Sequence, residues 1–201
     1  MPQTARPATG LIVMLHGWGA NAQDLVPIAP LTNLPDYQFI FPEAPFPHPY
    51  TFSGKMWYDL ESEDHQGLTE SREYLRDWLQ RLEAQTQIPL ERTILSGFSQ
   101  GGAMTLDVGL DLPLAGLVCF SGYLHPTDRP VGIPYPPVLL LHGGQDTVVP
   151  LRAAEQAYHV LQSWGVPVEY ETYPTMGHEI QPPLLEKMHH FVQTLPAFAA
   201  S

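Results

Sequence analysis

The chain has 201 residues, a length that fits one domain, residues 1–201, with a buried core of its own. Its 9 lysines and arginines against 21 aspartates and glutamates give a net charge of −12, so a nucleic acid backbone or an anionic membrane surface would repel it. The longest early apolar run, residues 11–15, is too short for a signal peptide or a transmembrane segment. We therefore expect a cytoplasmic protein.

Six short apolar segments have the pattern of buried strands. Four of them are nearly continuous in apolar residues rather than alternating, which is typical of strands covered on both faces of a parallel sheet. In chain order the predicted strands span residues 10–17, 37–45, 92–99, 114–122, 137–144 and 167–173.

Helical periodicity appears between and after these strands. Apolar residues at helical spacing predict an amphipathic helix near residues 69–85, a second over 153–161 and a last one over 184–192. Strands that alternate with helices imply right-handed crossovers and therefore an α/β fold with a mostly parallel, doubly wound sheet.

Two proline-rich stretches, 42–67 and 122–137, interrupt this alternation. Loops of this length in a compact domain are commonly functional or disordered, and the many aromatic residues of the first argue against disorder. Two interpretations of the first stretch stay open: a packed surface loop and a wall of a substrate pocket.

The pentapeptide Gly97-Phe98-Ser99-Gln100-Gly101 has the pattern G-x-S-x-G. A predicted strand enters it and a helix of small residues leaves it, which is the arrangement of a nucleophile elbow. In such an elbow a strained turn exposes the serine hydroxyl, and the flanking glycines let the strand and the helix approach each other. The simpler alternative is a serine that caps a helix after a glycine turn.

A nucleophilic serine needs a base to take its proton and a carboxylate to orient that base. Asp146 follows the predicted strand 137–144, and His178 follows the predicted strand 167–173. The order Ser99, Asp146, His178 is the one expected for an α/β-hydrolase sheet, in which catalytic groups gather at the carboxyl ends of strands. We predict that these three residues form a catalytic triad.

Other candidates for these roles fit less well. His16 and His142 also end strands, but each precedes a glycine in a turn, where a structural role is favoured. Asp128 lies in a proline-rich loop with no strand just before it. A metal site of His16, His142 and His178 is disfavoured because no two of them have ligand-like spacing. Cys119 lies in an apolar run and is expected to be a buried core residue.

An acyl-transfer site also needs backbone N–H groups that stabilise the negative oxygen of the tetrahedral intermediate. One comes from the residue after the nucleophile, Gln100, and the other from a loop after an early strand. The segment Leu15-His16-Gly17-Trp18-Gly19 fits that loop, so we predict an oxyanion hole formed by the amides of Trp18 and Gln100.

Five segments, taken together, resemble the phospholipase/carboxylesterase family of the α/β-hydrolases, which includes bacterial carboxylesterases and acyl-protein thioesterases. They are LHGWGANAQDL, APFPHPYTFSGKMWYDL, GFSQGGAM, LLLHGGQDTVVP and GHEI, and they follow the family's order over almost the whole chain. The resemblance implies the triad and oxyanion donors given above, no cofactor, and hydrolysis of carboxylic esters or thioesters. The short connection after Asp59 leaves no room for a large lid domain.

We therefore expect a serine carboxylesterase that hydrolyses esters of short- to medium-chain acyl groups through an acyl-enzyme, with a small-molecule or lipid ester or thioester as its partner. A thioesterase or lysophospholipase, a peptidase and a non-catalytic binding module are the alternatives. Met56, Trp57 and Tyr58 are expected to line an acyl pocket, unless they serve ordinary core packing. The chain is expected to be a monomer or a homodimer, and an exposed apolar patch on the aromatic loop would indicate a dimer.

Overall fold

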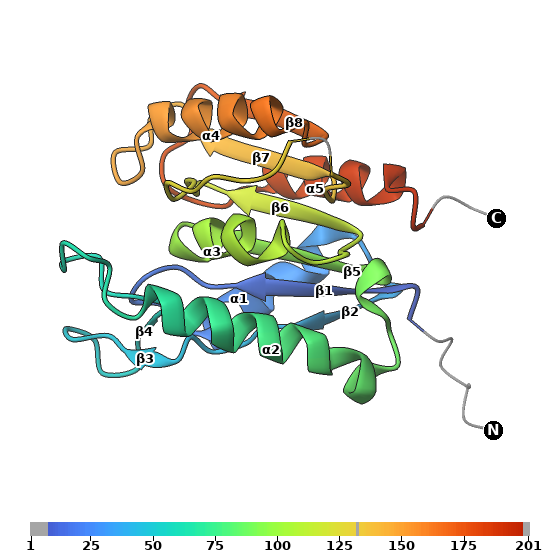
Figure 1. Ribbon diagram of the computed structural model, residues 1–201, viewed down its shortest axis with the longest axis horizontal. Helices are drawn as coiled ribbons and strands as arrows, with labels where there is room; N and C mark the ends of the chain where they lie inside the picture. The colour runs from blue at the N-terminus through green and yellow to red at the C-terminus, as the bar shows by residue number, and fades with distance from the viewer. Residues whose placement is uncertain (1–7, 132, 199–201) are drawn as a thin grey trace.

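The computed structural model describes residues 8–131 and 133–198, and a parallel sheet of six strands runs through its centre (Figure 1). The spatial order is β2-β1-β5-β6-β7-β8, and every neighbouring pair is parallel. The strands are β1 (Gly10–Leu15), β2 (Tyr37–Ile40), β5 (Thr93–Phe98), β6 (Gly116–Phe120), β7 (Val138–Gly143) and β8 (Val168–Tyr173). All six predicted strands are present, and the α/β prediction is confirmed.

Helices cover both faces of the sheet. Helices α2 (Leu68–Thr86), α3 (Gln100–Gly109) and α4 (Leu151–Trp164) pack on one face, and the 3-10 helix η1 (Val26–Thr32) and α5 (Pro182–Thr194) pack on the other (Figure 1). In β1, Leu11 and Val13 contribute to the first core, whereas Ile12 and Met14 contribute to the second. Because both faces are buried, the strand sequence is continuously apolar rather than alternating.

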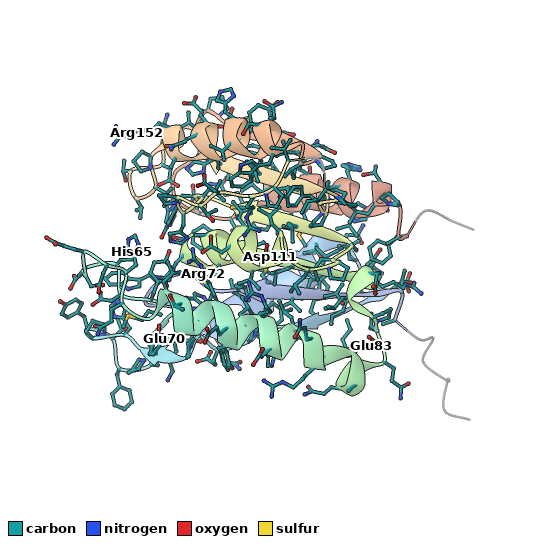
Figure 2. All side chains as sticks on the ribbon, viewed as in Figure 1. His65, Glu70, Arg72, Glu83, Asp111 and Arg152 are labelled. Atoms are coloured by element: carbon teal, nitrogen blue, oxygen red, sulfur yellow. The ribbon has the colours of Figure 1, made fainter. Side chains whose placement is uncertain are left out.

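The helix ends follow from local backbone chemistry. Helix α2 begins after Gly67 and ends before Gln87, and both of these residues have left-handed backbone conformations, with φ of 92° and 61°. Between α2 and α3, Arg72 binds Asp107 and Arg76 binds Asp111 at 2.9 and 3.1 Å. Figure 2 labels Arg72, on α2, and Asp111, which follows the end of α3.

The structure differs from the sequence prediction mainly in the first proline-rich stretch. The predicted strand 37–45 ends at Ile40, shortly before Pro42, because proline has no N–H to donate to a sheet. The stretch 42–67 also holds a small antiparallel ribbon of β3 (Phe46–Pro47) and β4 (Lys55–Met56). Strands of two residues are too short to give a periodic sequence signal.

Two short helical elements, α1 (Ala22–Leu25) and η2 (Leu90–Arg92), complete the described elements. None of the helices in the described ranges is long and apolar enough to cross a membrane. The loop after β1, the turn after β5 and the turns after β7 and β8 lie at one edge of the sheet, since all the strands run the same way. The β3–β4 ribbon lies at this edge as well (Figure 1).

Candidate active site

Ser99 occupies the sharp turn between β5 and α3. Its φ and ψ are 56° and −118°, a combination that costs energy in a residue with a side chain. A Cβ added at Gly97 would lie 2.2 Å from the Gly101 carbonyl oxygen, and one at Gly101 would lie 2.3 Å from the Leu15 carbonyl oxygen. The two glycines are therefore required by space, because the turn packs against itself and against β1.

A hydrogen-bonded chain connects Ser99 to His178 and Asp146. The Ser99 Oγ lies 2.9 Å from His178 Nε2, and His178 Nδ1 lies 2.7 Å from Asp146 Oδ2. An ionised carboxylate only accepts hydrogen bonds, so the Nδ1–H donates to Asp146, and Nε2 is left to accept the Ser99 hydroxyl proton. The imidazole is therefore in the tautomer that can act as a base toward serine.

The Asp146 side chain has no exposed surface and is held at both oxygens. Its Oδ1 accepts hydrogen bonds from the backbone N–H groups of Val148 and Val149, at 2.9 and 2.8 Å. Burial raises the pKa of this carboxyl, but the hydrogen bonds from His178, Val149 and Val148 outweigh burial, so the net pKa is lower than its ordinary value. Asp146 is thus an anion fixed in orientation beside the imidazole.

The two residues predicted to supply oxyanion donors lie in segments next to the serine. Gln100 is the first residue of α3, and Trp18 lies in the loop after β1. A Cβ at Gly17 would lie 3.3 Å from Ser99 Cβ, which shows how closely this loop passes the serine. Neither amide donates to an acceptor within the described residues. Free N–H groups beside a nucleophile, one of them at a helix N-terminus, suit a developing oxyanion.

The rival histidines have structural partners close to the site. His16 is buried, and its Nδ1 donates to the Gly17 carbonyl at 2.8 Å while its Nε2 accepts from the Ala44 amide at 3.1 Å. Burial lowers its pKa, which favours this neutral form. His142 Nε2 donates to the Val149 carbonyl at 2.8 Å. The two histidines therefore bind segments that carry candidate site residues.

The three residues expected to line an acyl pocket have different environments. Trp57 and Tyr58 are fully buried in the core beneath α2, and Met56 is half-buried. The burial of the two aromatic side chains favours their core-packing alternative, and a pocket role for all three stays a prediction. One further contact has no signal in the sequence: the side chain of Gln100 binds the backbone of both Trp57 and Tyr58.

The remaining candidates lie outside this chemistry. Asp128 is exposed, in the loop after β6. Cys119 is buried in β6, and burial raises the pKa of its thiol to about 12, which makes it a poor nucleophile. Across residues 8–131 and 133–198, no three histidine, cysteine, aspartate or glutamate side chains are placed to hold a metal ion.

A parallel sheet covered by helices, with a serine elbow after β5 and a histidine and an aspartate after the following strands, defines an α/β-hydrolase. Comparison with known proteins gives the family within that fold. A family model described as Phospholipase/Carboxylesterase matches residues 2–196. The chain belongs to the phospholipase/carboxylesterase family, and it is a hydrolase of esters.

Relatives within the family have been named for two related activities. Acyl-protein thioesterase 1 of Neurospora crassa is 30% identical over 99% of this chain and 92% of its own. A probable carboxylesterase of Oryza sativa is 28% identical over 96% of this chain and 80% of its own. Among solved structures, the esterase PE8 superposes with a TM-score of 0.85 at 31% identity, covering 97% of this chain and 96% of its own.

Proposed function

We propose that the protein is a serine carboxylesterase that hydrolyses esters of short- to medium-chain acyl groups. The observation that carries the proposal is the hydrogen-bonded chain from Ser99 Oγ through His178 to Asp146, with distances of 2.9 and 2.7 Å. The strained Ser99 backbone supports the same chemistry, because such strain is commonly stored at functional sites. The amides of Trp18 and Gln100 support it as well, because they have no acceptor within the described residues.

In the proposed reaction His178 Nε2 takes the hydroxyl proton while Ser99 Oγ attacks the ester carbonyl carbon. The carbonyl oxygen becomes negative and accepts hydrogen bonds from the amides of Trp18 and Gln100. When the tetrahedral intermediate collapses, His178 gives the proton to the departing alcohol and the acyl group stays on Ser99. Water, deprotonated by His178, then attacks the acyl-enzyme. As the bond from the acyl carbon to Ser99 Oγ breaks, His178 returns the proton to that oxygen, which releases the acid and restores the enzyme. Asp146 stabilises the imidazolium in both steps.

The test is hydrolysis of p-nitrophenyl esters from acetate to palmitate by the wild type and by Ser99→Ala. We expect the variant to lose about 10⁴-fold or more in kcat, because the members of a triad act as a unit. Ser163→Ala is the matched control, since that serine is exposed on α4 and far along the chain from the turn. Activity that survives in Ser99→Ala would refute the triad.

Thioester hydrolysis is the second candidate, and it is favoured by the name of the relative from Neurospora crassa. The same nucleophile and oxyanion donors would serve an acyl thioester, with a thiolate as the leaving group. Parallel kcat/KM measurements on a p-nitrophenyl ester and an S-acyl thioester of equal chain length decide between the two. A lysophospholipid tested alongside them checks for lysophospholipase activity. A folded wild type inactive on all of these would favour a binding module.

Three expectations from the sequence remain predictions. The first is that residues 1–201 form a single domain, and the second is a cytoplasmic location. The third is the monomer or homodimer. Tyr50 and Phe52 are 69% and 111% exposed between β3 and β4. An exposed apolar patch on this aromatic loop is the feature that a dimer would require.

A further inference from the structure

The indole of Trp57 is bonded to the loop that carries the Trp18 amide. Its Nε1–H donates to the carbonyl of His16 at 3.0 Å, and the ring has no exposed surface. The strand that leads into Trp57 binds the same loop through Lys55, whose carbonyl accepts from the Gly19 amide at 2.9 Å and whose amide donates to the Ala20 carbonyl at 2.8 Å. Trp57 and the strand before it therefore pack against the loop after β1.

These contacts fix the direction in which the Trp18 N–H points. The Gly17 carbonyl and the Trp18 N–H belong to one planar peptide group and point in opposite directions. The His16 imidazole holds that carbonyl at 2.8 Å. The preceding peptide group carries the His16 carbonyl, which is the group that Trp57 binds. Two consecutive peptide groups are thus held, and the second of them supplies the oxyanion donor.

The side chain of Gln100 connects Trp57 to the other donor. Its Oε1 accepts from the Trp57 backbone N–H at 2.9 Å, and its Nε2 donates to the Tyr58 carbonyl at 2.7 Å. The backbone N–H of the same residue, Gln100, is the second oxyanion donor. Gln100 is fully buried, so these hydrogen bonds do not compete with bulk water. One short network therefore runs from one donor, through Trp57, to the other.

We propose that Trp57 is a positioning residue for the oxyanion hole and sets the relative placement of the Trp18 and Gln100 amides. The inference rests on the proposed function. Trp57 acts through the His16 carbonyl and through Gln100 and need not touch the substrate. This role differs from lining an acyl pocket. An oxyanion hole binds the carbonyl oxygen of every ester, so its loss affects all acyl chain lengths equally, whereas a change in a pocket wall affects some chain lengths more than others.

The test is Trp57→Phe, which keeps an aromatic ring and removes the indole N–H. We expect kcat to fall about 10- to 100-fold, less than the 10²- to 10³-fold that follows loss of a donor, because the Trp18 amide remains but is no longer held. KM should change little, and the loss should be the same for acetate, butyrate and octanoate esters. The inhibition constant of an arylboronic acid, whose tetrahedral adduct places an oxygen in the hole, should rise by a similar factor.

Trp164→Phe is the matched control, since Trp164 is another buried tryptophan and lies at the last residue of α4. It should leave kcat and the boronic acid constant unchanged. If Trp57→Phe does not fold, placing β-(3-benzothienyl)alanine at position 57 removes the N–H while keeping the shape of the indole.

Two results would overturn the inference. The first is a lowered melting temperature with unchanged kcat and boronic acid binding, which would make Trp57 a core residue alone. The second is a loss that depends on acyl chain length, which would make it a pocket wall. Both outcomes are measured on Trp57→Phe after the wild type has been shown to be active and to require Ser99. They are therefore distinct from failure of the proposed function, in which Ser99→Ala stays active or the wild type is inactive.

Discussion

Asp146→Asn tests whether the carboxylate sets the tautomer of His178. The change keeps the size of the side chain and removes its charge. The N–H groups of Val148 and Val149 both need an acceptor, which the amide oxygen can supply. The amide NH2 group then faces His178 Nδ1, which now lies 2.7 Å from a carboxylate oxygen. Two donors cannot share that contact, so Nδ1 must give up its proton.

The proton then resides on His178 Nε2, the atom that lies 2.9 Å from Ser99 Oγ. An imidazole protonated at Nε2 cannot take the serine proton, so only the rare correct tautomer turns over. We expect kcat to fall about 10³- to 10⁴-fold. That loss corresponds to about 4 to 5.5 kcal/mol of transition-state stabilisation, at 1.36 kcal/mol for each factor of ten.

The assay is steady-state hydrolysis of p-nitrophenyl butyrate near pH 7.5, with Asp128→Asn as the matched control. Asp128 is the other aspartate considered for the acid, and it is exposed, so its variant should keep wild-type kcat. Circular dichroism and a urea titration check that Asp146→Asn is folded. A folded Asp146→Asn within about tenfold of the wild type would refute the tautomer argument, and so would an equal loss in Asp128→Asn.

Three further predictions concern stability and reactivity. Cys119, with a thiol pKa of about 12 and 3% exposure, should resist a thiol reagent near pH 8 until urea unfolds the chain, and prompt labelling of the native protein would contradict this. Burial lowers the pKa of His16, so its contribution to the free energy of unfolding is present above about pH 6.5 and is lost as the pH falls through the lower folded value. Urea titrations between about pH 7 and pH 5 should show a shallower decline for His16→Gln than for the wild type, and equal slopes would refute the assignment. Gly101→Ala, whose Cβ would lie 2.3 Å from the Leu15 carbonyl oxygen, should lower the free energy of unfolding by about 1 to 3 kcal/mol, and an unchanged urea midpoint would contradict the steric argument.

The continuous apolar strands and the helical stripes between them were enough to predict the α/β fold and all six sheet strands. For the inner strands β1, β5, β6 and β7 this is so because a strand buried on both faces is apolar at nearly every position. The G-x-S-x-G segment likewise pointed to Ser99, since the spacing of its glycines reflects a local steric need. Asp146 and His178 could be predicted as the acid and the base of a triad, because chain order and strand ends restrict where such groups can lie.

Only the tertiary structure decided the environments and contacts of Trp57, Tyr58 and the Gln100 side chain. Trp57 and Tyr58 were open to two interpretations in the sequence, because an aromatic residue in a proline-rich loop suits a pocket and a core equally well. Their burial, and the hydrogen bond from the Trp57 indole to the His16 carbonyl, come from packing of the stretch 42–67 against the loop after β1. The side-chain hydrogen bonds of Gln100 join residues more than 40 positions apart. Contacts at that separation depend on how the elements are placed in space, and the periodicity of a single sequence carries no information about them.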